Sequence, residues 1–206
     1  DGQQVEKPDL WLDQDLACQI GRPSKQYAVS FGGQVINMGD KKEWHPSEEI
    51  SAMAYDEIIP GYGGDVANPL RLWTAHAGNR FDLVDFNRGD YASAVRAQNS
   101  DENISRVLYP NDSTDSGREL RLKQEYFLVS ASVQDIVAGH KCRFPSIKNL
   151  ADKVAIHLND THPVLAIPEL MRILIDEEGI AWTEAWNMCC KIFSYTNHTL
   201  MSEALE

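Results

Sequence analysis

Long hydrophobic runs are missing from this sequence of 206 residues. No apolar stretch approaches the ~20 residues that a membrane-spanning helix needs, so a membrane protein is not expected. Residues 1–9 also lack the basic segment followed by an apolar one that marks a secretory signal, although a leader upstream stays compatible with this. The sequence therefore favours a water-soluble protein.

Cysteine and positive charge are scarce as well. The spacing of Cys18, Cys142, Cys189 and Cys190 matches neither a zinc site nor a disulfide framework. Cys189 and Cys190 lie in an apolar helical pattern and are interpreted as reduced core residues, which favours a cytoplasmic protein. The net charge of −12 would repel a phosphate backbone, so nucleic acid is a poor candidate partner. The negative charge would not repel a neutral polysaccharide, which therefore stays a possible partner.

The first half of the chain is typical of strands, and no repeat or low-complexity linker interrupts it. The predicted strands are 27–31, 34–38, 50–55 and 70–75. Gly32-Gly33 joins the first two, which are therefore expected to form a hairpin. The turn-forming segment 60–64, rich in proline and glycine, is expected to be a loop between the other two.

The second half is typical of helices around one strand. A helix over 118–137 is predicted from a buried stripe at three-to-four spacing, formed by Leu122, Tyr126, Val129 and Val133. The other predicted elements are helix 91–98, strand 154–158, turn 159–163, helix 164–178 and helix 183–195, the last capped by Thr183. A strand, a polar turn and a helix in succession indicate an α/β fold, in which ligands bind at the carboxyl ends of strands.

Residues 159–162 form the densest polar cluster, at such a strand end. Asp160 and His162 could exchange hydrogen bonds with sugar hydroxyl groups. Alternatively, Asp160 or Thr161 only caps the following helix. A metal site of His157, Asp160 and His162 is a further alternative, which the alternation of strand side chains disfavours for His157.

Two further polar clusters lie at 195–199 and 109–117. In the first, Asn197 could simply cap the preceding helix and His198 could be a surface residue. The second is rich in turn-forming residues and fits either a solvated loop or a mobile gate over a site. Arg121 follows closely enough to face that gate.

Several strings, in this order and spacing, resemble the α-glucan phosphorylase family, and most closely its bacterial glycogen phosphorylases. They are VLYPNDSTDSGRELRLKQEY at 107–126, IHLNDTHPVLAIPELMR at 156–172, YTNHTLMSEALE at 195–206, IPGY at 59–62 and LRLW at 70–73. The resemblance implies an α/β chain that is an internal part of the N-terminal domain in a two-domain, Rossmann-like (GT-B) glycosyltransferase. Within it, 1–88 would be strand-rich, 89–152 would hold the gate loop and long helix, and 153–206 would carry sugar-site residues.

The resemblance also implies what the parent enzyme does. It would release glucose 1-phosphate from the non-reducing end of an α-1,4-glucan, glycogen or maltodextrin, using inorganic phosphate. It would be an allosteric, cytoplasmic homodimer that binds pyridoxal 5'-phosphate through a lysine outside this chain, so the chain alone is expected to be inactive. A sugar-nucleotide glycosyltransferase of the same architecture, or a truncated module that only binds glucan or dimerises, remains an alternative.

The family's site residues can be matched one by one. His198 matches the catalytic histidine, whose side chain holds the reacting sugar's primary hydroxyl and whose carbonyl faces the positive charge that develops. The matched substrate-binding residues are Tyr109, Asp112, Arg121, Asp160, His162, Thr199, Glu203 and Ala204. No residue matches a cofactor or metal site. We expect Tyr109, Asp160, His162 and His198 to converge on one concave face.

Three positions depart from the family pattern. Ser113 replaces an asparagine that bonds the reacting sugar in many relatives. Residues 16–19, Leu-Ala-Cys-Gln, replace the usual Asn-Pro-Trp-Glu, so local packing or a subunit contact is expected to differ there. Ala138-Gly139 replaces an arginine pair that binds the nucleotide activator in animal relatives.

The last departure predicts that the intact enzyme responds little to AMP. A phosphate group is gripped best by bidentate, permanently charged donors, which neither Ala138 nor Gly139 supplies. Without that grip AMP has little differential affinity for two states of the enzyme. Titration with AMP at subsaturating phosphate should leave the activity unchanged or nearly so. A tenfold activation that is lost when Lys141 and Arg143 are replaced would contradict the prediction and reveal a different phosphate clamp.

Overall fold

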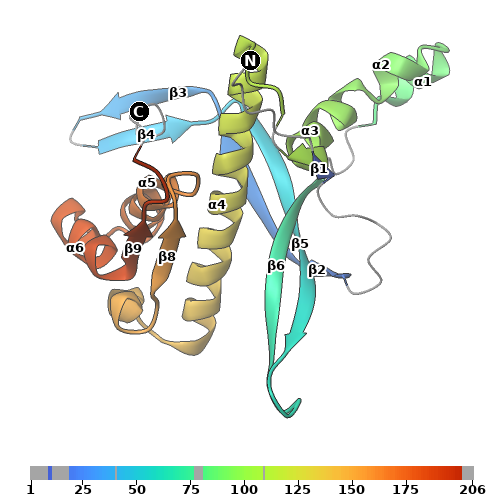
Figure 1. Cartoon of the computed structure of the whole chain (residues 1–206). Helices are drawn as coiled ribbons and strands as arrows, with labels where there is room; N and C mark the ends of the chain where they lie inside the picture. The colour runs from blue at the N-terminus through green and yellow to red at the C-terminus, as the bar shows by residue number, and fades with distance from the viewer. Residues whose placement is uncertain (1–8, 11–18, 40, 77–80, 109, 201–206) are drawn as a thin grey trace. The chain divides into compact units, whose positions relative to one another are not determined.

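The computed structural model describes residues 9–10, 19–39, 41–76, 81–108 and 110–200 (Figure 1). This mixed α/β chain divides into two compact units, one of Asp1–Ile36 with Trp44–Phe127 and one of Asn37–Glu43 with Leu128–Glu206. The long helix α4 (Asp115–Arg143) begins in the first unit and ends in the second. Within the described residues, no helix is both long enough and apolar enough to cross a membrane.

The strands and the other helices follow in chain order. The strands are β1 (Asp9–Leu10), β2 (Gln19–Phe31), β3 (Gln34–Met38), β4 (Lys41–His45), β5 (Glu48–Pro60), β6 (Ala67–His76), β7 (Val107–Leu108), β8 (Ile156–Asn159) and β9 (Phe193–Thr196). The helices besides α4 are α1 (Leu83–Asn87), α2 (Tyr91–Ala94), α3 (Arg96–Arg106), α5 (Ala166–Arg172) and α6 (Trp182–Ile192). A 3₁₀ helix (Ile147–Asp152) precedes β8, and a π-helical turn (Ile173–Glu177) continues α5.

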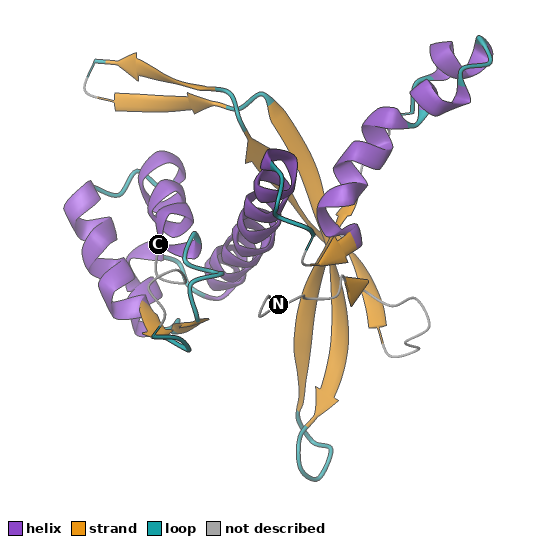
Figure 2. Ribbon diagram, turned by 45° about the horizontal axis from the view of Figure 1, so that its top comes forward, coloured by secondary structure: helices purple, strands orange, loops and turns teal. Residues whose placement is uncertain are grey.

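The first unit is built on the antiparallel sheet β2-β5-β6, whose long strands are visible in Figure 2. Every second residue of β5 is buried, and Ile50, Ala52 and Ala54 form one row of the core. This alternation is what an antiparallel sheet with one covered face requires. On the flanking strands, the rings of Tyr27 and Trp73 meet edge to face at 5.6 Å between centroids.

The predicted hairpin of 27–31 with 34–38 is wrong. β2 pairs with β5, where Phe31 lies opposite Glu48, and β3 pairs with β4 instead. Gly32 and Gly33 have φ of 60° and 80°, so the chain turns away after β2. A Cβ on Gly33 would overlap the carbonyl of His45, because the end of β4 returns to this point. The glycine pair thus allows the backbone after β2 to pass close to the backbone at the end of β4. It does not form a tight hairpin turn.

The other predicted strands of this unit are confirmed and are longer than expected. β5 and β6 contain 50–55 and 70–75 and are joined by the predicted loop, which the hydrogen bond from Gly61 N to Val66 O closes at 2.7 Å. The predicted helix 91–98 is broken at Val95 into α2 and α3. The long helix is confirmed over 115–143, but its supposed buried Leu122 is 57% exposed.

The second unit contains β8 and β9, α5, α6 and the second part of α4. Strand 154–158 is confirmed as β8, and helix 164–178 as α5 with its π-helical extension, which ends before Gly179. The predicted end of the last helix is wrong, because 193–196 form the strand β9. Thr183 does not cap α6, whose N-cap Ala181 makes no side-chain bond. Of the two adjacent cysteines only Cys189 is buried, and burial raises the pKa of its thiol to about 11.

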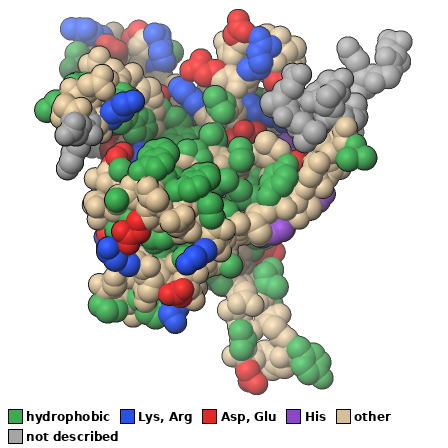
Figure 3. Space-filling model, turned by 90° about the vertical axis from the view of Figure 1, so that its left-hand side faces the viewer, with side chains coloured by type: hydrophobic (Ala, Val, Ile, Leu, Met, Phe, Trp, Pro, Cys, Tyr) green, Lys and Arg blue, Asp and Glu red, His purple; other side chains and the backbone are tan. Residues whose placement is uncertain are grey.

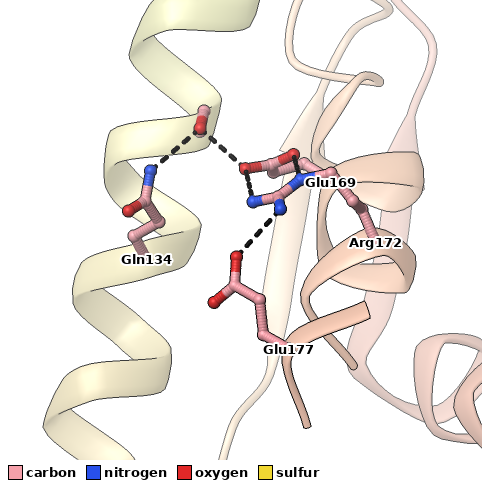
Figure 4. Close-up of polar contacts among 5 residues, drawn as sticks. Gln134, Glu169, Arg172 and Glu177 are labelled. Carbon is pink, nitrogen blue, oxygen red and sulfur yellow. Dashed lines mark hydrogen bonds and ion pairs between the residues drawn. The ribbon is translucent and has the colours of Figure 1, made fainter. Parts of the chain in front are cut away.

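A polar network around the buried Glu169 of α5 connects this helix to α4 within this unit (Figure 4). Arg172 donates from Nε and Nη2 to the two carboxylate oxygens of Glu169, at 2.8 and 3.0 Å, and from Nη1 to Glu177 at 2.8 Å. Glu169 is 2% exposed and also accepts from Ser130 Oγ of α4, at 2.7 Å. Burial opposes the charge of Arg172, but its two carboxylate partners raise its pKa. The network fixes the π-helical turn and α5 against α4.

A second buried carboxylate lies across the three strands of the first unit. Asp56 of β5 is 2% exposed and accepts from Arg71 Nε of β6 at 2.7 Å and from Arg22 Nε of β2 at 2.9 Å. The hydrogen bond from Arg71 lowers the pKa of Asp56, against the opposing effect of burial, and Arg22 lowers it further. The side chain of Asp56 therefore links all three strands, in addition to the backbone hydrogen bonds between them.

Replacement Asp56→Asn is expected to destabilise the intact protein by about 2–3 kcal/mol at pH 7, because two arginines lose their shared carboxylate. The folded-state pKa of Asp56 lies below the ordinary 3.8, so its contribution is present above about pH 4 and is lost as the pH falls through the folded value. Urea denaturation at several pH values should show that the difference in the free energy of unfolding between the wild type and the variant becomes smaller below pH 4. Glu57→Gln, on the half-buried neighbour, is the control with the same charge change. An equal effect of both variants would contradict the prediction.

Candidate functional site

The carboxyl ends of two parallel strands meet in the second unit. Residues 156–159 of β8 pair in register with 193–196 of β9, so that Asn159 lies opposite Thr196. The pairing continues one residue further, because Asp160 N donates to Thr196 O at 2.8 Å. Two polar segments 37 residues apart, 160–162 and 197–199, therefore leave the sheet at the same edge (Figure 1). This is the edge that binds ligands in parallel α/β sheets.

His198 is joined to this edge by its ring. Its Nε2 lies 2.5 Å from Oδ1 of Asn159. An amide oxygen only accepts, so Nε2 is the donor in this contact, and Nδ1 is not engaged by it. Asn197 holds the following turn, because its Oδ1 accepts from Thr199 N at 3.0 Å and its Nδ2 donates to Thr199 O at 2.6 Å. Asn197 therefore shapes the His198 segment and does not cap α6, which ends at Ile192.

Asp160 has the only positive φ, 69°, found at a non-glycine position of the described chain. Its carboxylate stabilises this left-handed conformation locally, because Oδ1 accepts from Thr161 N at 2.7 Å. The N-cap of α5 is Leu165, which makes no side-chain bond, so neither Asp160 nor Thr161 caps that helix. The half-buried Asp160 and the exposed His162 thus lie on a turn that is specified separately from the helix.

The remaining polar groups of this edge pair with one another. Thr161 Oγ1 lies 2.9 Å from the hydroxyl oxygen of Tyr195. The ring nitrogens of His157 contact Ser194 Oγ at 2.9 Å and Thr196 Oγ1 at 2.8 Å, both on β9. His157 is committed to these hydroxyls, and the described residues contain no cluster of acidic, histidine or cysteine side chains that could hold a metal.

The first unit brings together two other residues of the sequence prediction. Asp112 Oδ2 accepts from Arg121 Nη1 at 2.8 Å, which joins the loop before α4 to the second turn of that helix. Both side chains are partly exposed, at 54% and 33%, so the pair can reach a ligand. Tyr109, Glu203 and Ala204 lie outside the described residues.

Asp160, His162, His198 and Thr199 thus share one edge, and Asp112 and Arg121 share another site. Convergence of Tyr109 with the first group stays a prediction, as do the roles of all these residues. Sequence reasoning missed Asn159 as the partner of His198. A polar residue at the end of an apolar strand is a signal for such a role, but its partner could be found only through the pairing of β8 with β9.

Comparison with known proteins gives one consistent result. Residues 1–206 match the family model described as carbohydrate phosphorylase. The chain is 63% identical to the glycogen phosphorylase of Pasteurella multocida over 206 residues, and 60% identical to that of Haemophilus influenzae over 205 residues. It is 49% identical to the brain form of human glycogen phosphorylase over 213 residues. Each alignment covers all of this chain and 25% of the relative, so the chain spans about a quarter of their length.

The strained turn at Asp160 predicts unequal effects of two substitutions. Asp160→Val should destabilise the intact protein by about 1–2 kcal/mol, because a β-branched residue disfavours positive φ and removes the bond to Thr161 N. Asp160→Asn should cost little, since asparagine adopts this conformation and keeps an oxygen acceptor. Thermal melts of both variants compare them. Equal melting temperatures would show that the turn is not constrained as described.

Proposed function

This chain belongs to the carbohydrate phosphorylase family, and on that premise we propose that it forms part of an α-1,4-glucan phosphorylase. The intact enzyme transfers the terminal glucose of glycogen or maltodextrin to inorganic phosphate and releases glucose 1-phosphate. The observation that supports this most directly is the edge of the β8-β9 sheet, where Asp160, His162 and His198 lie together. Carboxylate and imidazole groups at such an edge suit the many hydroxyls of a sugar, whose neutrality agrees with the acidic chain.

His198 is the proposed catalytic residue of this chain. Its ring is oriented by Asn159, which leaves Nδ1 to accept a hydrogen bond from a sugar hydroxyl. The backbone carbonyl of His198 is proposed to direct its negative end at the positive charge that develops on the reacting sugar. Such a contact strengthens towards the transition state, so it serves the rate more than the binding of substrate.

The other matched residues are proposed to bind the glucan chain. Asp160 and His162 hold the sugars next to the reacting one, and Thr199 follows His198 on the same turn. Asp112 and Arg121, which pair with each other in the first unit, are included among the glucan-binding residues on the family pattern. We include Tyr109, Glu203 and Ala204 in the binding surface on the family pattern alone.

Pyridoxal 5'-phosphate is proposed for the intact enzyme, where its phosphate group supplies acid–base chemistry. Three lysines of the described residues are paired with carboxylates, which disfavours the neutral amine that this attachment requires. Hydrogen bonding to Glu178 raises the pKa of Lys141, and Lys123 keeps a raised pKa through Glu48 although burial opposes it. Lys148 is paired with Glu184 at 3.1 Å. On the family pattern, the attachment lysine is expected outside this chain, and this chain by itself is expected to be inactive.

Exposed aromatic and aliphatic side chains support the proposal that further protein packs against this chain. On α6, Trp182 and Trp186 are 68% and 48% exposed. Figure 3 shows hydrophobic side chains among charged ones at the surface. Apolar surface of this kind marks contacts between proteins or domains. A cytoplasmic homodimer, in a two-domain GT-B architecture, is the arrangement that we propose.

The proposal is tested by phosphate-dependent release of glucose 1-phosphate from glycogen and maltodextrin by the intact protein. His198→Ala should lower kcat about 10²-fold or more while KM changes little, because the lost contact is strongest in the transition state. Asn159→Ala should lower kcat by a smaller factor, because it only frees the ring. Ser194→Ala, on the same sheet, is the control. An unchanged kcat with weaker glucan binding would limit His198 to substrate binding, and no phosphate-dependent release by the wild type would refute the proposed function.

A further inference from the structure

The loop that contains Asp112 is held against the first turn of α4 by a close approach of the two backbones. Gly117 lies in that turn, and a Cβ added to it would overlap the carbonyl oxygen of Asn111. The same Cβ would lie 2.9 Å from the carbonyl carbon of Asn111 and 3.2 Å from Cα of Asp112. All of these neighbours are backbone atoms, so no side-chain rotation could relieve the overlap.

Local hydrogen bonds surround this contact and support the conformation of the loop. Gly117 N donates to Thr114 Oγ1 at 3.1 Å, and Arg118 N donates to Thr114 O at 3.0 Å. Within the loop, Ser113 N donates to Asn111 Oδ1 at 2.9 Å. These bonds bring the loop down onto the helix at the point where only a glycine leaves room.

Two arginines of α4 then bind the loop residue next to the contact. Arg118 Nη1 donates to Asp112 O at 3.2 Å, and Arg121 Nη1 donates to Asp112 Oδ2 at 2.8 Å. Arg118 also pairs with Asp115. The carboxylate of Asp112 thus reaches Arg121 in a conformation in which the backbone of 111–112 lies against the helix at Gly117.

We propose that Gly117 is a positioning residue for the glucan-binding pair Asp112 and Arg121. Its missing side chain allows 111–114 to pack on α4 in the conformation that forms this ion pair. Several glycines of the described chain, such as Gly63 and Gly89, adopt positive φ, but Gly117 does not, so its backbone angles alone would allow any residue. The requirement for glycine at this position is one of space.

This inference rests on the proposed function for its effect on activity, but not for its effect on structure. Gly117→Ala should push the carbonyl of Asn111 away by about 1 Å or more, since real Cβ contacts are not shorter than 3.0 Å. Because Asp112 and Arg121 contact the glucan away from the reacting bond, the effect on activity should be in KM for glucan and not in kcat.

Gly139 of the same helix supplies a matched control. It also lacks positive φ, but a Cβ there meets no described atom within 4 Å. Gly139→Ala should therefore keep or improve helix stability, as this substitution ordinarily does in a helix interior. The two variants make the same chemical change in one helix and differ in what the new methyl group meets.

The test compares both variants in the intact protein by hydrogen exchange of peptides that cover 110–118. Gly117→Ala should speed exchange at the amides of Ser113 and Gly117 about tenfold or more, and Gly139→Ala should leave it unchanged. In the activity assay, Gly117→Ala should raise KM for glucan about tenfold with kcat within twofold of the wild type. Unchanged exchange in Gly117→Ala would overturn the proposal.

The hydrogen-exchange measurement and the activity assay test different claims, so one can fail without the other. If the wild type does not cleave glucan with phosphate, the proposed function fails while the exchange result still decides the positioning of the loop. If Gly117→Ala does not fold, Thr114→Val removes the acceptor of Gly117 N without adding bulk, and faster exchange of 110–118 is expected again. Normal exchange in that variant would count against the proposal.

Discussion

The parallel pairing of β8 with β9 is the constraint on which the candidate site depends. Four residues of each strand lie in register, and this alone brings 160–162 next to 197–199. The cross-strand contacts of His198 with Asn159, of Thr161 with Tyr195, and of His157 with Ser194 and Thr196 all follow from that register. A shift by one residue would turn every one of these side chains to the other face of the sheet.

Buried carboxylates hold each unit in shape around its apolar core. Asp56 joins three strands through Arg22 and Arg71, and Glu169 joins α5 to α4 through Arg172 and Ser130. Each carboxylate is almost fully buried, and hydrogen bonds from its guanidinium partners offset the cost of burying its charge. Such pairs add less to stability than to the uniqueness of the arrangement, which is what a substrate-binding site requires.

The family and the site segments could be predicted from the sequence because they are local strings. The turn at 159–162 and the polar segment after residue 195 were located by their residue types, and the match of residues 1–206 to the carbohydrate phosphorylase family confirms the resemblance. The strand pairing of the first half could not be predicted in the same way. Gly32-Gly33 reads locally as a hairpin turn, but β2 gains a longer, half-buried partner in β5.

The sequence by itself determined the α/β composition, the strand–turn–helix at 156–172 and the residues available for sugar binding, because propensity, turn chemistry and residue type act over a few neighbours. Only the tertiary structure decided which of those residues meet. The partner of His198 is Asn159, 39 residues away, and the space that Gly117 leaves is filled by the backbone of Asn111. Both depend on the register of distant strands or on the close approach of two backbones, which no local pattern of side chains encodes.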